Sequence, residues 1–247
     1  MESASIKVVV SLSGGMDSAV CAALAVHDFG AQSVAALHVS YGQRTEEREL
    51  VSFRAVCDRL GIHHRMMVKT PFFQLIGGSA LTDTQIAVPE AGPAIGEHIP
   101  VTYVPFRNAH FLSAAVSWAE VLGAERIYMG AVQQDSSGYP DCRPEFYRAF
   151  NEAVRTGTKD GRIRIETPLI ALRKSEIVTR GLELSAPFDL TWSCYSRDDA
   201  ACGSCDSCVL RLRAFAAAGA VDPIPYLSQT AVQDFHVAAT HDQASRN

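Results

Sequence analysis

A loop of small and hydroxyl-bearing residues near the N-terminus has the residue types of a phosphate-binding site. It reads S-G-G-M-D-S from Ser13 to Ser18 and joins a β-branched apolar run to an alanine-rich, helix-favouring stretch. Two glycines let backbone N–H groups approach an anion, and a helix start adds unpaired donors and a positive dipole end. The loop lacks the Walker A lysine and the G-x-G-x-x-G dinucleotide pattern. The simpler alternative is a glycine turn in which Asp17 or Ser18 only caps the helix. We predict that the phosphate-binding residues are Leu12, Ser13, Gly14, Gly15, Met16, Asp17 and Ser18.

Four cysteines near the C-terminus have the spacing of metal ligands. Cys194, Cys202, Cys205 and Cys208 follow the pattern C-x7-C-x2-C-x2-C, and four soft ligands so close in sequence suit tetrahedral Zn²⁺. The chain has seven cysteines, and an odd number excludes complete disulfide pairing. An iron–sulfur cluster is the main competitor, but the run lacks the x3-C-P ending of a ferredoxin. We therefore predict a closed, structural zinc site.

The elements that must position these residues alternate between strands and helices. Short β-branched runs predict strands at residues 6–12, 34–39, 62–68, 101–104 and 126–132. Helices are expected at residues 19–28, 45–60, 108–122, 145–155, 174–184 and 209–218. Residues 70–100 are rich in proline and glycine and predict a long lid or binding loop. The alternation predicts an α/β fold with a Rossmann-like, doubly wound parallel sheet.

Composition and charge narrow the classes of function. The 247 residues are 47% hydrophobic and 20% charged, which is ordinary for a globular protein. The net charge is −5 and the basic stretches at 162–164 and 211–213 are short, so a small-molecule substrate is favoured over nucleic acid. The chain shows neither a signal-peptide pattern nor a run approaching the roughly 18 apolar residues of a membrane span. We expect a cytoplasmic protein with no membrane partner.

The motifs resemble known families at two levels. The S-G-G-M-D-S loop resembles the PP-loop of the ATP pyrophosphatases, which implies ATP and Mg²⁺ as cofactors and an adenine nucleotide alpha hydrolase-like fold. Further stretches resemble the 7-cyano-7-deazaguanine synthases of queuosine and archaeosine biosynthesis, and they span residues 8–226. These stretches are SGGMDSAVC, YGQRT, GSALTD, SSGYPDCRPEF, TPL followed by KSEIV, and LTWSCY followed by CGSCDSC.

The second resemblance implies a carbon–nitrogen ligase. Its substrates would be 7-carboxy-7-deazaguanine, ammonia and ATP, and its product 7-cyano-7-deazaguanine. The implied route runs through an adenylated acid, an amide and an adenylated amide, with release of AMP and pyrophosphate. The resemblance also implies a homodimer. We expect residues 1–186 to form the PP-loop domain, residues 187–227 a small zinc-binding segment, and residues 228–247 a frayed tail.

Catalytic and substrate residues are predicted within this frame. Asp17 is expected to contact Mg²⁺ or the phosphate network, and Ser13 and Lys174 complete the predicted catalytic set. A polar loop follows the predicted strand at 126–132, the usual place for ligands in open α/β sheets. There a carboxylate can accept paired N–H donors of a deazaguanine, and an arginine can pair with the substrate carboxylate. Turn-stabilising or solvated roles fit these side chains equally well. The predicted substrate contacts are Arg107, Asp135, Tyr139, Asp141 and Arg143.

Four residues depart from the family pattern. The pattern has Phe-Asp where this chain has Val39-Ser40, glycine at Phe106 and tyrosine at Ser136. These departures concern the adenine and substrate contacts and leave the PP-loop and the cysteines intact.

Two other functions compete with the ligase. A PP-loop enzyme of tRNA thiolation would also adenylate a base, but it predicts a basic face and active-site cysteines. A zinc-ribbon-like binding module would have a degenerate nucleotide loop, whereas S-G-G-M-D-S is intact.

Overall fold

The computed structural model describes residues 5–92, 95, 98–133 and 138–228. Its centre is a five-stranded, wholly parallel sheet in the order β3-β2-β1-β4-β5. The strands are β1 (Val8–Ser11), β2 (Val34–Ser40), β3 (His64–Lys69), β4 (Arg126–Met129) and β5 (Arg164–Glu166). Every residue of β1 and β2 is buried, as expected for parallel strands covered on both faces.

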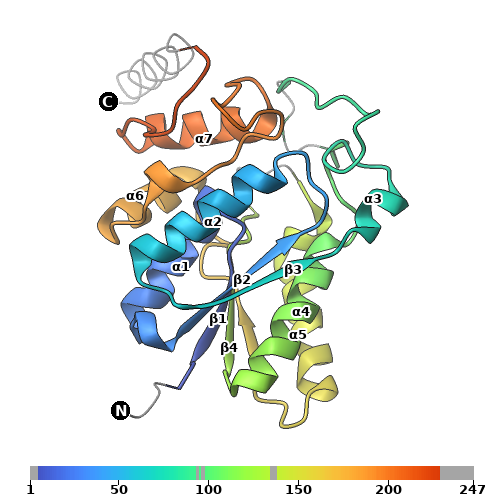
Figure 1. The fold of residues 1–247 in the computed structure, drawn as a ribbon, viewed down its shortest axis with the longest axis vertical. Helices are drawn as coiled ribbons and strands as arrows, with labels where there is room; N and C mark the ends of the chain where they lie inside the picture. The colour runs from blue at the N-terminus through green and yellow to red at the C-terminus, as the bar shows by residue number, and fades with distance from the viewer. Residues whose placement is uncertain (1–4, 93–94, 96–97, 134–137, 229–247) are drawn as a thin grey trace.

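Helices cover both faces of this sheet (Figure 1). On one face pack α1 (Met16–Phe29), α2 (Glu46–Leu60) and α6 (Lys174–Glu183), against side chains that include Val8 and Val10. On the other face pack α4 (Arg107–Leu122) and α5 (Pro144–Gly157), against side chains that include Val9. Neighbouring residues of β1 thus enter opposite cores, because side chains alternate along a strand. The doubly wound parallel fold predicted from the sequence is confirmed.

The strand order reverses between β1 and β4. From β1 the chain proceeds outward to β2 and β3, and from β4 it proceeds outward on the other side to β5. The connections that leave the carboxyl ends of β1 and β4 therefore diverge, and open α/β sheets bind ligands in the crevice at such a reversal. The predicted phosphate loop follows β1, so it lies at this crevice.

Two strand predictions differ from the structure. Residues 101–104 form a turn between Pro100 and Pro105, in which the Tyr103 N–H donates to the Pro100 carbonyl. Prolines on both sides restrict the backbone, and the turn at Pro100 uses the Tyr103 N–H, which favours a turn over a strand. The fifth strand, β5, was not predicted; with three residues it is too short for an apolar pattern to show.

The predicted lid loop at 70–100 is held at several points. A short helix, α3 (Phe72–Ile76), follows β3 directly. Arg44 donates to the carbonyls of Ala80, Asp83 and Ile86 at 2.6, 2.9 and 2.6 Å. The Ala91 N–H donates to the Ser204 carbonyl at 2.7 Å, so the loop also contacts the cysteine-rich segment.

The C-terminal segment packs beside the sheet domain. It contains a 3-10 turn at Phe188–Leu190 and the helix α7 (Asp206–Ala217), which lies against α6 (Figure 1). Phe215 of α7 belongs to the core of the α1 face, whereas Trp192 and the four cysteines form a small core of their own. The boundary predicted at 186/187 remains a prediction, and the predicted tail lies, apart from Ser228, outside the described residues. No described helix has the length and apolarity needed to cross a membrane.

Candidate active site and metal centre

A cavity of about 250 Å³ opens at the carboxyl ends of β1 and β4, where the strand order reverses. It brings together most of the residues predicted for phosphate binding and catalysis, although they come from distant parts of the chain. Gly14 is the one predicted loop residue that does not contribute to the lining. The predicted residues that line the cavity are Leu12, Ser13, Gly15, Met16, Asp17, Ser18, Arg107, Tyr139 and Lys174.

The phosphate loop is a tight turn that ends at the start of α1. The hydroxyls of Ser13 and Ser18 lie 3.1 Å apart, the Gly15 N–H donates to Ser13 Oγ at 3.2 Å, and Ser18 Oγ donates to the Gly15 carbonyl at 2.9 Å. Gly15 is the N-cap of α1 and has no side chain to occupy the first N–H groups of the helix. Those donors and the helix dipole therefore remain available to an anion in the cavity.

Two glycines allow the surrounding backbone to approach this loop closely. Gly14 has a φ of 94°, and a Cβ there would lie 2.6 Å from the Glu49 carbonyl oxygen of α2. Gly130 follows β4, and a Cβ there would lie 3.0 Å from the backbone N and Cα of Ser18. Side chains at these positions would displace α2 or the start of α1, so the loop needs glycine at both.

Asp17 and Lys174 form an ion pair at the cavity. Lys174 Nζ contacts Asp17 Oδ2, and the two side chains are only 14% and 23% exposed. The other carboxylate oxygen, Asp17 Oδ1, is buried and has no hydrogen-bond partner among the described residues. A buried carboxylate oxygen without a partner is costly, and a divalent cation with its phosphate ligands would satisfy it. The residues present therefore fit Mg²⁺.

Arg107 lies in the cavity among aromatic rings. Its guanidinium carbon lies 5.1, 5.5 and 5.9 Å from the ring centroids of Tyr41, Phe111 and Tyr139. Arg107 Nη1 donates to the Tyr41 hydroxyl at 2.9 Å, while Nε is buried without a partner in the described part of the chain. Stacked rings hold a guanidinium plane in one orientation, so Arg107 presents a fixed cation to an anionic ligand.

The other predicted substrate residues are placed differently. Asp141 is buried outside the cavity lining, and its Oδ2 accepts the Asn108 N–H at 2.9 Å, so it caps the first turn of α4. Tyr139 lines the cavity and donates to Thr102 Oγ1 at 3.0 Å. Arg143 is exposed at the start of α5, away from the cavity. Asp135 and Ser136 lie outside the described residues.

Several residues that line the cavity were missed by the sequence predictions. Tyr41 and Glu49 come from the end of β2 and the first turns of α2, next to the YGQRT stretch. Trp192, Ser193 and Tyr195 come from the TWSCY stretch, and the Trp192 N–H donates to the Gly14 carbonyl at 2.9 Å. Both stretches carried the family resemblance, but no periodicity singles out their side chains. Burial raises the pKa of Tyr195 well above its usual value, so its hydroxyl stays protonated.

Val39 and Ser40 both depart from the pattern described in the sequence analysis, and only Val39 lines the cavity. Val39 is among the lining residues, whereas Ser40 is buried at the end of β2, where its carbonyl accepts the Thr70 N–H at 2.8 Å. Val39 therefore presents an apolar side chain at the cavity wall.

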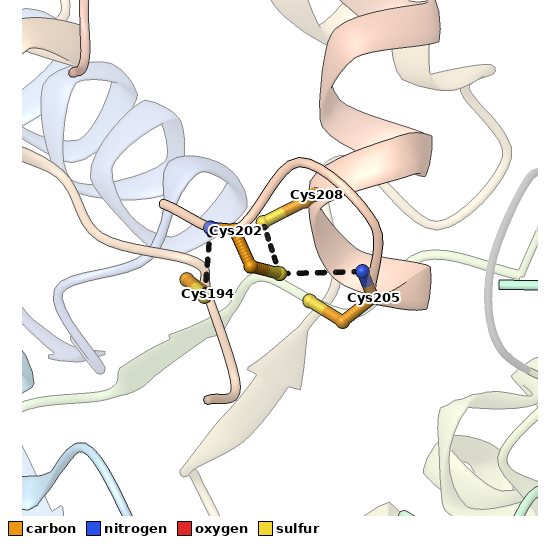
Figure 2. A group of neighbouring side chains, drawn as sticks. All are labelled: Cys194, Cys202, Cys205 and Cys208. Carbon is orange, nitrogen blue, oxygen red and sulfur yellow. Dashed lines mark hydrogen bonds between the residues drawn. The ribbon is translucent and has the colours of Figure 1, made fainter. Parts of the chain in front are cut away.

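The four cysteines form a cluster that could hold a metal ion (Figure 2). Their sulfur atoms all lie within 4.8 Å of one another. The sulfurs of Cys202 and Cys208 are 3.8 Å apart, and four thiolates around one zinc ion, with Zn–S bonds of about 2.3 Å, would be separated by about 3.8 Å. The Cys205 N–H also donates to Cys202 Sγ at 3.3 Å. The residues present therefore fit one tetrahedral ion.

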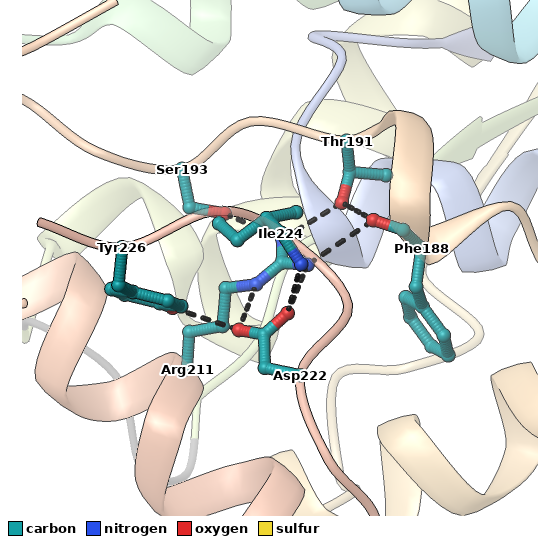
Figure 3. A network of polar contacts seen from close by, with 7 residues as sticks. All are labelled: Phe188, Thr191, Ser193, Arg211, Asp222, Ile224 and Tyr226. Atoms are coloured by element: carbon teal, nitrogen blue, oxygen red, sulfur yellow. Dashed lines mark hydrogen bonds and ion pairs between the residues drawn. The ribbon is translucent and has the colours of Figure 1, made fainter. Parts of the chain in front are cut away.

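A buried ion pair fastens α7 to the chain that follows it (Figure 3). Arg211 donates to both carboxylate oxygens of Asp222, at 2.7 and 2.9 Å, and the two side chains are 2% and 0% exposed. The Tyr226 hydroxyl donates to the same carboxylate at 2.7 Å. Arg211 Nη1 also donates to Thr191 and Ser193, at 2.7 and 3.2 Å. Through these bonds Arg211 holds the TWSCY stretch, and it lines the cavity itself.

Known proteins match this chain along most of its length. The sequence family described as "Queuosine biosynthesis protein QueC" matches residues 7–219. The 7-cyano-7-deazaguanine synthase of Koribacter versatilis is 72% identical over 228 residues, which cover 92% of this chain and 96% of that protein. The synthase of Acidobacterium capsulatum is 66% identical over 223 residues, which cover 89% and 96%.

Among solved structures, the NMN synthetase from Francisella tularensis aligns over 96% of this chain and 86% of its own, with 18% identity and a TM-score of 0.47. The family match and the identities to curated enzymes far exceed what chance similarity gives. The chain belongs to the QueC family of queuosine biosynthesis, the 7-cyano-7-deazaguanine synthases.

Proposed function

We propose that this chain converts 7-carboxy-7-deazaguanine and ammonia to 7-cyano-7-deazaguanine, with ATP cleaved to AMP and pyrophosphate. The observation that carries the proposal is a single cavity that presents an anion-binding helix start, the Asp17–Lys174 pair and the fixed cation Arg107. Adenylation needs alignment and charge neutralisation more than a covalent nucleophile. One such site can activate both the acid and the amide, because each presents an oxygen to the α-phosphate.

The phosphate loop and α1 would hold the leaving pyrophosphate. Ser13 supplies a hydroxyl, and the first backbone N–H groups of α1, after the N-cap Gly15, supply further donors. Lys174 supplies a positive charge next to the same phosphates. When bound to Asp17, Mg²⁺ neutralises phosphate charge and polarises the α-phosphate. Ser13, Asp17 and Lys174 are therefore our proposed catalytic residues.

Arg107 and Tyr139 would contact the deazaguanine acid. Arg107 has an unpaired, buried Nε that faces no other acceptor in the described chain, and its fork suits a carboxylate or the adenylate. Asp141 would act through Arg107, since it caps the first turn of the helix that Arg107 begins. For Asp135 and Arg143 the substrate role remains the prediction made from the sequence.

We propose zinc as the metal of the four-cysteine cluster. The sulfur separations suit one ion. In an iron–sulfur cubane the cysteine sulfurs stand farther apart, because irons and sulfides lie between them. Metal analysis of the purified protein should give about one zinc per chain and no iron; iron with a visible absorption band would contradict the assignment.

The reaction is tested by incubating the protein with Mg-ATP, ammonium and 7-carboxy-7-deazaguanine and following nitrile and AMP by mass spectrometry. Wild type should form both. Asp17→Asn should lower AMP formation by at least about 10²-fold, since a charge that organises the phosphates is lost. A folded, metal-loaded wild type that forms neither product would refute the proposed function. The homodimer implied by the resemblance is tested separately by measuring the molar mass of the protein with light scattering after size-exclusion chromatography.

A further inference from the structure

A carboxyl group of α2 lines the cavity and is held by two neighbours. Glu49 Oε2 accepts Gln43 Nε2 at 2.9 Å, and Glu49 Oε1 accepts Thr45 Oγ1 at 3.0 Å. The orientation of the Gln43 amide is fixed in turn, because its Oε1 accepts the Tyr41 N–H at 2.9 Å. Each oxygen of Glu49 keeps a free lone pair after these bonds. The carboxyl group is therefore positioned and can still accept a proton.

The surroundings of Glu49 differ from those of the other carboxylate of the cavity. Asp17 is paired with Lys174, whereas Glu49 forms no ion pair with the described residues and is partly buried. The charged groups that face it are Arg107 from α4 and Glu46 from its own helix, with the Tyr41 hydroxyl at the end of β2. Burial raises the pKa of Glu49 to about 7, while its two hydrogen bonds and Arg107 act in the opposite direction. Two carboxyl groups in different environments are suited to different roles.

The proposed reaction releases protons from nitrogen at three steps. In amide formation, the ammonia nitrogen bonds to the carbonyl carbon, the C–O bond to AMP breaks, and the nitrogen loses one proton. When the amide oxygen is adenylated, the nitrogen carries two hydrogens and a positive charge, and it loses one proton to give the neutral adenylated amide. Nitrile formation then removes the last N–H proton; its electron pair becomes the third C–N bond, and AMP leaves with the C–O pair. A proton acceptor must lie beside this nitrogen.

We propose that Glu49 is the catalytic base that accepts these protons, and that Gln43 and Thr45 are its positioning residues. The inference rests on the proposed function and adds a residue to it. Other lining groups in the described chain are less suited: burial raises the pKa of Cys142 to about 11 and that of Tyr41 above its usual range, so both stay protonated near neutral pH. Asp17 is paired with Lys174, and its other oxygen is assigned to Mg²⁺ in the proposed function.

The first test separates proton transfer from adenylation. Exchange of labelled pyrophosphate into ATP in the presence of 7-carboxy-7-deazaguanine measures adenylation of the carboxylate. This step releases no proton. Conversion of the amide intermediate to nitrile measures the proton-releasing step and needs no ammonia. Glu49→Gln keeps the size of the side chain and one of its two acceptor oxygens, but it cannot accept a proton as a carboxylate does. It should keep exchange within about threefold of wild type and lose nitrile formation by about 10²- to 10⁴-fold. Glu47→Gln, at an exposed position of the same helix, is the matched control and should change neither.

The second test uses the pH dependence of nitrile formation from the amide. A base works in its ionised form, so the wild-type rate should rise with pH through about 7 and then level off. Thr45→Val removes a hydrogen bond that lowers the pKa of Glu49, so its midpoint should move to higher pH. A purely structural role of Glu49 would leave the midpoint in place.

The outcomes distinguish this inference from the proposed function. A wild-type enzyme that makes no nitrile from acid or amide would refute the function itself. An active wild type with a folded Glu49→Gln variant of equal rate and equal pH profile would overturn only the role of Glu49. Loss of exchange together with nitrile formation in Glu49→Gln would also overturn it, because adenylation of the carboxylate, which exchange measures, needs no base.

Discussion

Phe106, at the start of α4, has a backbone conformation that side chains disfavour. Its φ is 58° and its ψ is 23°, the left-handed helical region, and 56% of its surface is exposed. Glycine reaches this region without a steric penalty. For other residues the cost is roughly 1–2 kcal/mol. The neighbours Asp141 and Arg107 fix the helix start, so the strain is located beside the cavity.

Glycine at position 106 should therefore be tolerated better than alanine. Both substitutions lose the ring contacts with His110 and Phe146, but only glycine relieves the backbone. Measured by urea unfolding, the free energy of unfolding of Phe106→Gly should be about 1 kcal/mol higher than that of Phe106→Ala. Equal stabilities, or a more stable alanine variant, would show that the left-handed conformation is not retained.

Glu49 should make the free energy of unfolding depend on pH. Burial raises its pKa to about 7 from the ordinary value of 4.5, so the unfolded chain ionises first as pH rises. The contribution of this group to stability is fully present below pH 4.5, declines between 4.5 and 7, and is constant above 7. Urea unfolding should be compared at about pH 5 and about pH 8, which enclose most of this decline. Between these two pH values the free energy of unfolding should fall less for Glu49→Gln than for wild type. An identical decrease in both would mean that the carboxyl group is not buried as described.

The sequence predicts cavity residues where they stand together in one short motif, and it misses those that only the fold brings to the cavity. Ser13 to Ser18 stand in one short motif whose chemistry depends on immediate neighbours, and six of the seven predicted loop residues line the cavity. Glu49 belongs to a charged helix in which it resembles its solvated neighbour Glu47. Only the fold, which places α2 against Gly14, reveals which of the two faces the cavity.

The contact between β4 and α1 determines where the phosphate-binding donors lie. Gly130 comes so close that a Cβ there would be 3.0 Å from the Ser18 backbone. Gly130→Ala should push the start of α1 away by a few tenths of an ångström, and misplacement of a catalytic group strongly reduces rates. We expect kcat/KM for ATP to fall by about tenfold or more, with a loss of stability of about 1–3 kcal/mol.

Gly157→Ala is the matched control for this contact. Gly157 ends α5, and a Cβ there would meet no atom within 4 Å, so the substitution should leave kcat/KM for ATP unchanged. Equal kinetics in the two variants would contradict a role for close packing between β4 and α1.

Most helices and strands could be predicted because their sequences are self-consistent. β1 and β2 are apolar runs, and the helices α2 and α4 each end at a glycine, Gly61 and Gly123, in the left-handed conformation common at helix ends. β5 could not be predicted, since its three residues become a strand only by pairing with β4. Tertiary contacts, which no local pattern records, decide such short elements.

The C-terminal segment is joined to the cavity and its surroundings at more than one point. The Trp192 N–H bonds to Gly14, Arg48 lies 4.6 Å from the Trp192 ring centroid, and Ser193 and Tyr195 line the cavity. The sequence predicted the cysteine cluster because four ligands fall within one short stretch. It did not predict the Arg211–Asp222 pair, because Arg211 stands in a short basic stretch beside the exposed Arg213. A buried arginine and a surface arginine are indistinguishable before the fold is known.

The metal should consequently support ATP binding from a distance. Cys194 lies two residues after Trp192, so the cluster fixes the stretch whose N–H bonds to the phosphate loop. Removal of the metal with a chelator should weaken ATP binding by about tenfold or more and lower the melting temperature, because binding energy at such sites is also folding energy. Both should recover on addition of Zn²⁺ but not of Mg²⁺, and Cys205→Ser should reproduce the metal-free state. A metal-free protein that is folded and binds ATP with unchanged affinity would show that the cluster and the phosphate loop are independent, and the coupling through Trp192 would then be wrong.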